Sequence, residues 1–426
     1  MFDSNQLNEI NEKQLSEHQR NWSFLKESLT NKGVAVEDLI QKISNFQIAI
    51  PSWALGTGGT RFGRFPLGGE PSTLEDKVKD VGLLHALNKS CGAISLHIPW
   101  DIPQDYDYIK KIAADLDLKF DAVNSNTFQD QPNSVHSYKF GSLCHADKTV
   151  RDEAIQHNKE VIDHGIKLGS KALTVWLADG TSFAGQHNFR EAFQRALDSL
   201  KEIYAHLPDD WKLLIEYKPY EPNFYSMVIP DWGTSHLLAA KLGEKAATLV
   251  DLGHHLPNTN IEQIVALLMY LNKLGGFHFN DSKFGDDDLD SGSINPFELF
   301  LIFNELTNAN KLGKLKNIAY MIDQSHNVTD PIESLILSSN EIINAYAKSL
   351  LVDYESLRDA QNCNDIIKSS QILKEAYSID VNPLCQMIRR EKEHAIDPIN
   401  VYRSLNYKEN KSKVRKDSGG SSSGIV

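Results

Sequence analysis

The sequence predicts an α/β protein built on a (β/α)8 TIM barrel, with an N-terminal helical cap and a C-terminal helical extension. Short apolar, β-branched runs recur along the 426 residues, and longer segments with helical spacing of apolar residues separate them. Strands that alternate with helices pair in parallel, and eight such strands close into a barrel. One barrel with extensions accounts for the length.

The N-terminal segment 1–45 is polar, with apolar residues at helical spacing, and predicts a cap of one or two helices. We assign residues 46–345 to the catalytic barrel. Its eight strands are expected at 46–55, 93–100, 120–126, 172–178, 212–218, 247–254, 275–281 and 317–325. The long connections after the first, third and seventh strands are expected to face the substrate, because loops at that end of a barrel build the active site.

The C-terminal part continues with helical patterns. Apolar residues three and four positions apart predict a helical extension over 346–407, and we expect it to contact another subunit. The last segment, 408–426, is rich in Lys, Ser and Gly, and is expected to be disordered.

Composition narrows the class of partner. The net charge is -13, from 44 Lys+Arg against 57 Asp+Glu, and such an acidic surface disfavours nucleic acid. No apolar run is long enough to span a membrane, so we expect no membrane partner. The four cysteines form no CxxC pair, and the N-terminus has no secretory leader pattern, which favours reduced thiols and a cytoplasmic protein.

Acidic residues and histidines gather where apolar runs end. The candidate metal ligands are Glu216, Asp251, His254, His278, Asp286, Asp288 and Asp323. Carboxylate and imidazole groups at the ends of successive barrel strands predict a shared site for divalent cations. Manganese, cobalt, magnesium and zinc all suit these ligands, whereas no cysteine is placed to build a structural zinc site.

Several of these residues also have structural interpretations. Asp251 could cap the following helix and leave His254 in a loop, although Gly253 allows the chain to turn the imidazole back toward the strand end. Glu216 could form a buried salt bridge with Lys218, which is expected to face the same side of the strand. Asp323 could be a helix N-cap.

The acidic run after the seventh strand has two interpretations as well. Consecutive carboxylates such as Asp286, Asp287 and Asp288 usually form a solvated turn. Here they follow His278 closely. Asp286 and Asp288 are two residues apart and are expected to share a face that meets His254, with Asp287 pointing away.

Together with the loop Gly-Thr-Gly-Gly-Thr-Arg-Phe-Gly-Arg-Phe-Pro at 56–66, these strand ends resemble the L-rhamnose isomerase family of the xylose isomerase-like barrels. The resemblance implies two divalent cations per subunit, most readily Mn²⁺, with Glu216 bridging them. The first would be held by Glu216, Asp251, His278 and Asp323, and the second by Glu216, His254, Asp286 and Asp288.

The same resemblance implies further roles. Lys218 would lie near the substrate carbonyl, His97 and Trp176 would contact the sugar, and Phe62 would reach a neighbouring active site in a homotetramer. His97 and Asp323 would assist ring opening. Without the resemblance, Trp176 could equally be a core residue, and the less favoured alternative for His97 is a hydrogen-bonded core histidine.

The activity implied is the interconversion of L-rhamnose and L-rhamnulose, and of other free sugars, by a metal-assisted hydride shift; an enediol route is also compatible with the residues. The alternatives are another sugar isomerase or epimerase, a metal-dependent phosphodiesterase, or a sugar-binding barrel without turnover. The acidic strand-end loops count against the phosphodiesterase.

Overall fold

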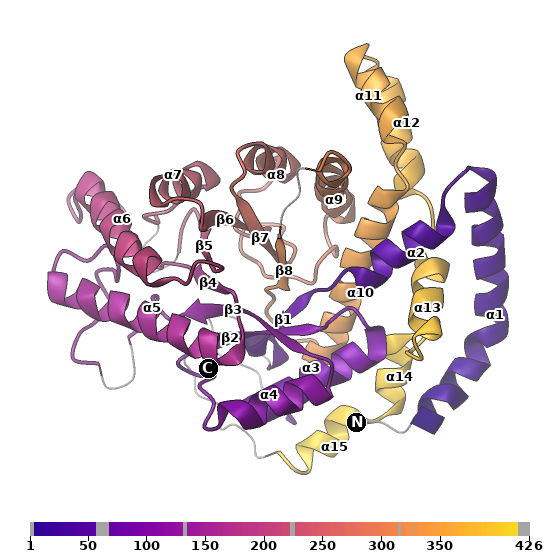
Figure 1. Cartoon of the computed structure of the whole chain (residues 1–426), viewed down its shortest axis with the longest axis horizontal. Coiled ribbons are helices and arrows are strands. Elements are labelled where there is room, and N and C mark those ends of the chain that lie inside the picture. The colour runs from indigo at the N-terminus through magenta and orange to yellow at the C-terminus, as the bar shows by residue number, and fades with distance from the viewer. Residues whose placement is uncertain are drawn as a thin grey trace.

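The chain forms the predicted closed barrel (Figure 1). The computed structural model describes residues 4–56, 68–130, 134–221, 226–313, 317–326 and 328–415. All neighbouring strands are parallel and follow the order of the sequence, and β8 pairs with β1 through Met321 and Ala49. The strands are β1 (Ala49–Pro51), β2 (Ala93–Ile98), β3 (Lys119–Ser125), β4 (Ala172–Val175), β5 (Lys212–Glu216), β6 (Ala246–Asp251), β7 (Leu274–Phe279) and β8 (Ala319–Ile322).

The interior of the barrel changes from apolar to polar along the strands. Ala122, Leu214, Ala247 and Leu249 form a small buried cluster inside it. Side chains two positions further along a strand point to the same interior, and on β5 that residue is Glu216. The apolar layer therefore closes the floor beneath a polar layer at the carboxyl ends of the strands.

Helices cover the outside of the barrel. They are α3 (Leu74–Asn88), α4 (Tyr106–Asp115), α5 (Lys148–Leu168), α6 (Phe189–His206), α7 (Trp232–Leu242), α8 (Ile261–Tyr270), α9 (Pro296–Lys311) and α10 (Pro331–Leu350). Most begin at a side-chain cap, such as Asp147, whose carboxylate accepts a hydrogen bond from Thr149 N before α5. The long connections after β1, β3 and β7 agree with the sequence prediction.

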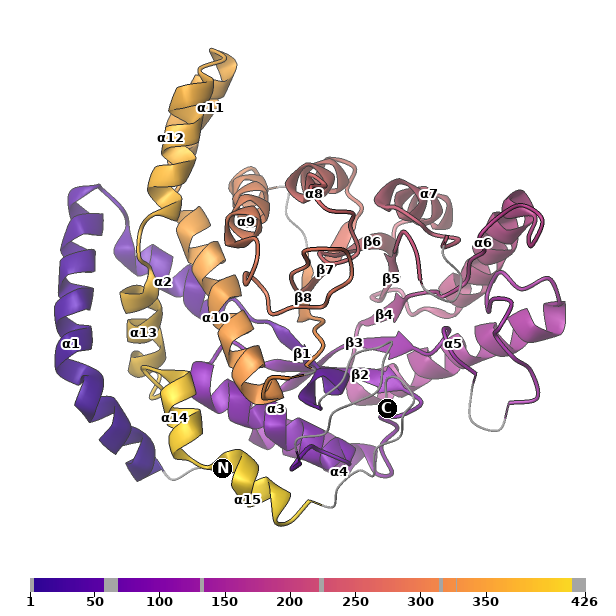
Figure 2. The ribbon, with the colours of Figure 1, turned by 180° about the vertical axis from the view of Figure 1, so that it is seen from behind.

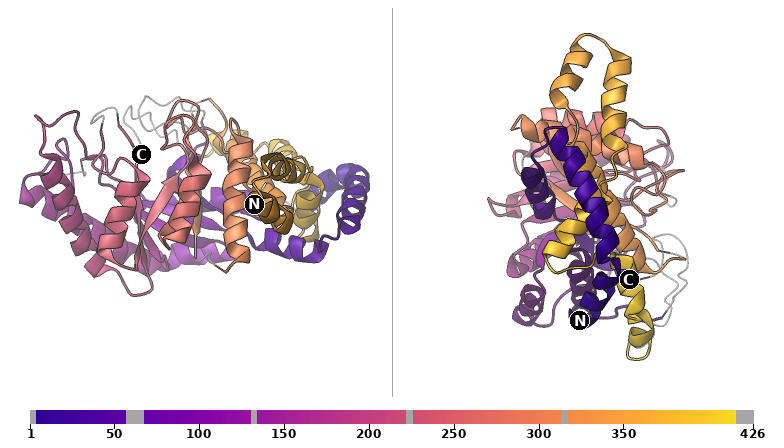
Figure 3. Two further views of the ribbon diagram at one scale, coloured as in Figure 1. Left: turned by 90° about the horizontal axis from the view of Figure 1, so that it is seen from above. Right: turned by 90° about the vertical axis from the view of Figure 1, so that its right-hand side faces the viewer.

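Additional helices lie to one side of the barrel, as Figure 2 shows. The N-terminal cap consists of α1 (Ser4–Asn31) and α2 (Val36–Asn45). The C-terminal extension consists of α11 (Tyr354–Asn362), α12 (Ile366–Tyr377), α13 (Asn382–Glu391), α14 (Pro398–Ser404) and α15 (Tyr407–Ser412). Helices α1 and α13 pack together, and the α11–α12 hairpin projects from the body (Figure 3).

Several predicted boundaries are wrong. Every strand ends before its predicted limit, most clearly β1, where Pro51 is followed by the short helix η1 (Ser52–Leu55). Proline has no N–H with which to continue the ladder. The domain boundary at 345 falls inside α10, because the apolar face of that helix continues to Leu350.

The prediction of a disordered tail from residue 408 is also wrong for 408–415. Helix α15 continues to Ser412, and the Arg415 side chain is buried against Asp80, with Nη1–Oδ2 and Nη2–Oδ1 distances of 2.7 Å. Contacts of Arg415 with Asp80 and with Gly69 O, the latter at 3.0 Å, hold this polar segment against the body, which composition alone does not indicate. Residues 416–426 lie outside the described residues.

Two further observations concern the whole described chain. All four cysteines are free thiols. Among the helices of the described residues, none combines the length and the apolar character that a membrane span requires.

Candidate metal centre and substrate pocket

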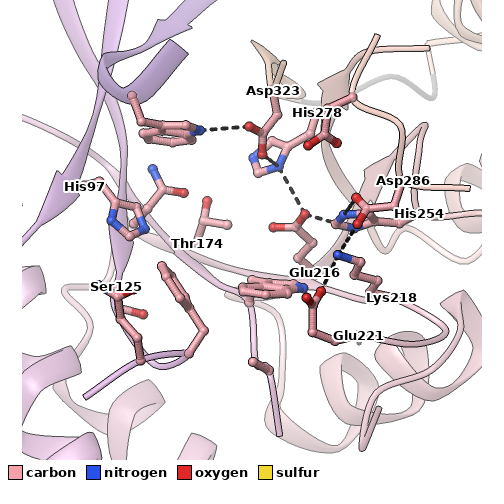
Figure 4. Close-up of a pocket in the computed structure, with 17 residues that line it drawn as sticks. His97, Ser125, Thr174, Glu216, Lys218, Glu221, His254, His278, Asp286 and Asp323 are labelled. Atoms are coloured by element: carbon pink, nitrogen blue, oxygen red, sulfur yellow. Dashed lines mark hydrogen bonds and ion pairs between the residues drawn. The ribbon is translucent and has the colours of Figure 1, made fainter. Parts of the chain in front are cut away.

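Four predicted ligands converge at the carboxyl ends of β5 to β8. Figure 4 shows three of them, Glu216, His278 and Asp323. Glu216, Asp251, His278 and Asp323 each offer an atom, and these atoms all lie within 4.8 Å of one another. The His278 Nδ1 atom is 3.3 Å from Glu216 Oε1, 3.3 Å from Asp323 Oδ2 and 3.8 Å from Asp251 Oδ2. The arrangement can hold one divalent cation with mixed oxygen and nitrogen ligands.

The parallel register explains this convergence. Asp251 is the last residue of β6 and is the register partner of His278 on β7. Glu216 ends β5, and Asp323 directly follows β8. Residues at corresponding strand ends of a closed parallel barrel face a common centre.

The electrostatics of the cluster suit a cation. Burial and the neighbouring charges of Glu216 and Asp323 raise the pKa of Asp251 to about 7, although His254 opposes this shift. Burial would lower the pKa of His278, but Glu216 and Asp323 outweigh it and raise that pKa well above its usual value. Burial likewise opposes ionisation of Glu216, yet His278 and His254 lower its pKa. Three carboxylates thus lie together in a buried site, where a divalent cation would supply compensating positive charge.

The second predicted set surrounds His254. Its Nδ1 atom is 3.2 Å from Glu216 Oε1, and its Nε2 atom is 3.2 Å from Asp286 Oδ1. Asp288 lines the same pocket and accepts a hydrogen bond from Ser325 Oγ at 2.9 Å. Glu216 therefore touches both sets, as a bridging ligand would. The tight convergence of the first set does not extend to Asp286 and Asp288 in the described structure.

The acidic loop 286–288 places Asp286 beside His254 by a backbone geometry other than the strand-like alternation that was expected. Asp286 and Asp288 both have left-handed backbone angles, φ 57° and 51°, so strand-like alternation does not apply to them. Asp286 N donates to Gly253 O at 2.7 Å, which ties the loop to the segment after β6. Asp287 points away, as predicted, and its carboxylate accepts backbone hydrogen bonds from Lys283 and Phe284.

Lys218 does not pair with Glu216, so the alternative of a buried salt bridge between them is wrong. It lies beyond the end of β5, and its Nζ atom forms ion pairs with Glu221, at 2.7 Å, and with Asp286. The ammonium also lies 5.2 Å from the centre of the Trp176 ring. Glu216 is instead held between two histidines, because it ends the strand while Lys218 belongs to the following loop.

A cavity of about 210 Å³ opens beside the cluster. On the side opposite the carboxylates its wall is aromatic. His97 stacks on Trp100 with ring centres 4.8 Å apart, and Phe128 lies 5.4 Å from His97 and 5.1 Å from Trp176. Burial lowers the pKa of His97 to about 4, so its imidazole is neutral.

His97 and Trp176 line the cavity and are not simply core residues. His97 Nδ1 and Trp176 Nε1 are buried, and neither finds a hydrogen-bond partner in the part of the chain that the structure describes. Polar atoms of this kind are suited to a polar ligand. Phe62 lies outside the described residues.

Sequence reasoning missed the residues that support the site. Trp53 of η1 donates a hydrogen bond from Nε1 to Asp323 Oδ1 at 2.8 Å. Asp101, which is 1% exposed, accepts hydrogen bonds from Ser52 Oγ, Lys77 Nζ and the His97 backbone. These contacts depend on barrel closure, and no local sequence signal indicates them.

Asp179 holds three loops of the site together. Its carboxylate accepts hydrogen bonds from Ser142 N, Ser142 Oγ and Cys144 N at 2.6, 2.7 and 2.9 Å. Its backbone oxygen accepts from Val228 N at 2.8 Å. The loops after β3, β4 and β5 are therefore joined at one buried residue, Asp179, through its carboxylate and its backbone oxygen.

The fold and the site agree with comparisons to known proteins. Residues 89–307 match the sequence profile of the family described as xylose isomerase-like TIM barrel. The chain belongs to that family.

Individual proteins are similar to this chain over more of its length than the family profile. The chain is 52% identical over 409 residues to a probable sugar isomerase of Mesorhizobium japonicum, covering 96% of this chain and 95% of the relative. It is 50% identical over 408 residues to a probable sugar isomerase of Rhizobium meliloti, with the same coverage of 96% and 95%. A xylose isomerase of Thermus thermophilus is 25% identical over 281 residues, covering 61% of this chain and 69% of that protein.

A solved structure of L-ribulose 3-epimerase has a TM-score of 0.50 and 16% identity, covering 75% of this chain and 98% of that one. At this identity the likeness concerns the fold.

Proposed function

We propose that the protein is a metal-dependent aldose-ketose isomerase that interconverts L-rhamnose and L-rhamnulose. The observation that carries the proposal is the cluster of Glu216, Asp251, His278 and Asp323 at the catalytic end of a xylose isomerase-like barrel. The relatives described as probable sugar isomerases match nearly the whole chain, which supports a sugar substrate.

The proposed ligands of the first cation are Glu216, Asp251, His278 and Asp323. Those of the second are Glu216, His254, Asp286 and Asp288, with Glu216 in common. Two divalent cations, which we expect to be Mn²⁺, would stabilise negative charge on the carbonyl and hydroxyl oxygens of the sugar.

The protein supplies the remaining chemistry. Lys218 is fixed by Glu221 and Asp286, so its ammonium is oriented in advance toward the oxygen on which charge develops. His97 is neutral, which leaves a ring nitrogen able to accept a proton during ring opening. Asp323 is the second candidate for that step.

The shape of the cavity favours a small sugar with an apolar patch. At about 210 Å³ it lies below the range of drug-sized pockets, roughly 300–1,000 Å³. Carboxylates line one side, while Trp53, Phe128 and Trp176 contribute to the other. A 6-deoxy sugar such as L-rhamnose would present hydroxyls to the first side and its methyl group to the second.

Two other functions fit less well. A phosphodiesterase would need Lys and Arg around the strand-end loops, whereas Asp286, Asp287 and Asp288 occupy them. A sugar-binding barrel without turnover would be expected to lack a ligand, and all seven proposed metal ligands carry suitable side chains.

The quaternary structure and location remain predictions. A homotetramer is expected, with the C-terminal extension as a contact between subunits. Ile366 and Ile367 at the start of α12 are 78% and 72% exposed, which is consistent with such a contact. Sedimentation analysis of the wild type and of an Ile366→Asp variant would test this, and a smaller particle is expected for the variant. The cytoplasmic location is likewise an expectation.

The decisive experiment uses protein stripped of metal with EDTA. L-rhamnose turnover is measured without metal and with added Mn²⁺, alongside Glu216→Gln and the control Glu221→Gln, which alters a carboxylate outside both proposed ligand sets. Formation of L-rhamnulose that Mn²⁺ restores in the wild type, and in the control at least in part, but not in Glu216→Gln supports the proposal. No turnover despite bound metal would contradict the L-rhamnose assignment and direct attention to other sugars.

A further inference from the structure

A buried hydroxyl group lines the cavity and has no hydrogen-bond partner in the part of the chain that the structure describes. Thr174 faces the barrel interior from β4 and is 2% exposed. Its Oγ1 atom is buried, and within the described ranges no group forms a hydrogen bond with it. Burial of an unpaired hydroxyl is unfavourable, and a valine of the same shape would avoid this cost.

The surroundings of Thr174 indicate where a partner would come from. Figure 4 places Thr174 between His97 on one side and Glu216 on the other, within the cavity. The layer below it in the barrel includes Ala122, Leu214 and Ala247, which offer no polar side chain. Those residues offer no partner, and a ligand in the cavity that Thr174 lines can reach the hydroxyl.

Asn124 lies beside Thr174 and is its register partner on β3. The Asn124 Nδ2 atom donates to Ser95 Oγ at 2.9 Å and to Leu96 O at 3.2 Å, so both amide hydrogens are engaged and the amide plane is fixed. Its Oδ1 atom remains as an acceptor, and Asn124 also lines the cavity.

We propose that Thr174 Oγ1 and Asn124 Oδ1 together bind one sugar hydroxyl that the metal cluster does not hold, and that this contact determines which sugars are accepted. The inference rests on the proposed function for the ligand being a monosaccharide. The sugar hydroxyl donates to Asn124 Oδ1 and accepts from the Thr174 hydroxyl, which satisfies both groups.

A contact of this kind discriminates strongly between sugars that have the hydroxyl and sugars that lack it. A site built to hydrogen-bond a substrate hydroxyl discriminates against the analogue that lacks it, because its own buried polar groups are then left unpaired. Aromatic contacts with Phe128 and Trp176 discriminate less between sugars of similar size. Thr174 is thus assigned as a specificity-determining residue.

The test compares Thr174→Val, which removes the hydroxyl and keeps the shape, with Thr174→Ser, which keeps it. Thr307→Val is the control, because Thr307 Oγ1 is buried between α9 and α10 and pairs with Ser349 Oγ at 2.7 Å. The KM for L-rhamnose and the urea midpoint of metal-free protein are measured for each variant.

We expect Thr174→Val to raise KM about tenfold, which corresponds to about 1.4 kcal/mol. Its urea midpoint should equal or exceed that of the wild type, since the hydroxyl has no hydrogen-bond partner among the described residues. Thr174→Ser should restore KM to within about threefold of the wild type. Thr307→Val should lower the midpoint and leave KM unchanged.

Deoxy sugars identify the hydroxyl that is bound. Wild type and Thr174→Val are compared on L-rhamnose and on its 3-deoxy, 4-deoxy and 5-deoxy analogues. One analogue should be insensitive to the substitution, because it lacks the partner of Thr174. An equal effect of Thr174→Val on all four sugars, or an unchanged KM for L-rhamnose, would overturn the inference.

Failure of the proposed function gives a different result. If the wild type with Mn²⁺ does not convert L-rhamnose, the proposed activity is wrong. The urea midpoint of Thr174→Val then tests the inference about the Thr174 hydroxyl. A midpoint of Thr174→Val below that of the wild type would mean that the hydroxyl stabilises the fold, and would overturn it. A midpoint at or above the wild-type value would support a ligand-facing hydroxyl.

Discussion

Trp53 Nε1 donates a hydrogen bond to Asp323 Oδ1 at 2.8 Å. Trp53 follows β1 and Asp323 follows β8, so this bond joins the two strands that close the barrel. The other carboxylate oxygen of Asp323 lies 3.3 Å from His278 Nδ1. The indole therefore fixes the Asp323 carboxylate with one oxygen directed toward the proposed first metal site.

Replacement of Trp53 by Phe should weaken metal binding. The variant keeps an aromatic ring but leaves Asp323 free to rotate, and loss of a group that orients a ligand typically costs 10–100-fold in metal affinity. We expect Mn²⁺ affinity, measured by calorimetry on stripped protein, to fall at least about tenfold. Trp100→Phe is the control, because Trp100 stacks on His97. Equal affinities in all three proteins would show that the indole does not orient the ligand.

Replacement of Lys218 by Met should separate catalysis from metal binding. The Lys218 side chain is 4% exposed, and its ammonium pairs with Glu221 and Asp286. Without it we expect kcat to fall about 100-fold, as for loss of a preorganised electrostatic group. Second-site affinity for Mn²⁺ should rise, because Asp286 loses its cationic partner. Lys283→Met, an exposed lysine of the loop after β7, should change neither quantity, and a similar loss of kcat there would contradict the assignment.

The C-terminal segment should depend on one buried ion pair. Arg415 and Asp80 have side chains 5% and 3% exposed. Removal of one member of a buried pair typically costs about 3–5 kcal/mol, so Arg415→Ala should lower the free energy of unfolding by about that amount in urea titrations.

An exposed ion pair of the C-terminal extension serves as the comparison with the buried pair of Arg415 and Asp80. Arg403 contacts Glu333 through two hydrogen bonds of 2.8 Å, but its side chain is 67% exposed. Arg403→Ala should cost less than about 1 kcal/mol. The double variant Asp80→Leu with Arg415→Met should recover much of the stability lost in Arg415→Ala. Equal costs for the two alanine variants would contradict the role of burial.

The free energy of unfolding should depend on pH because of His157. Burial lowers its pKa to about 4, and its Nε2 atom accepts a hydrogen bond from Asn126 N at 3.1 Å. The usual histidine pKa is about 6.5, so between pH 6.5 and pH 4 the unfolded chain binds more protons than the folded one. The stabilising effect of neutral His157 is therefore present above pH 6.5 and is lost as the pH falls toward 4.

The measurement is the free energy of unfolding between pH 4 and pH 7. His157→Gln, whose amide oxygen can still accept from Asn126, should reduce the slope by up to about 1.4 kcal/mol per pH unit. The exposed His206 serves as the control, and His206→Gln should keep the wild-type slope. An unchanged slope in His157→Gln would mean that other groups account for the acid sensitivity.

The barrel and the convergence of four candidate ligands could be predicted from the sequence, because local periodicity marks the strands and the candidate ligands stand at their ends. Apolar runs mark the strands, and a parallel barrel brings all strand ends to one edge, so Glu216, Asp251, His278 and Asp323 had to lie close together. Strand lengths were overestimated because polar residues just beyond a strand, such as Asp323, look continuous with it.

Other contacts could not be predicted because they join distant segments. Arg415 and Asp80 are 335 positions apart, and the polar composition of the tail indicated disorder. Trp53 meets Asp323 only through closure of the barrel. Alternation along the strand placed Lys218 on the same side as Glu216 and left a salt bridge between them open, but the strand ends at Glu216 and Lys218 pairs with Glu221.

The central claim is that Glu216 is shared by two cation sites required for isomerisation. The most direct measurement is the number of Mn²⁺ ions bound per chain after stripping and reloading, in wild type, Glu216→Gln and Asp288→Asn. We predict two ions in the wild type, the loss of one in Asp288→Asn, and weakening of both in Glu216→Gln. Two tightly bound ions in Glu216→Gln, with L-rhamnose turnover retained, would contradict the claim.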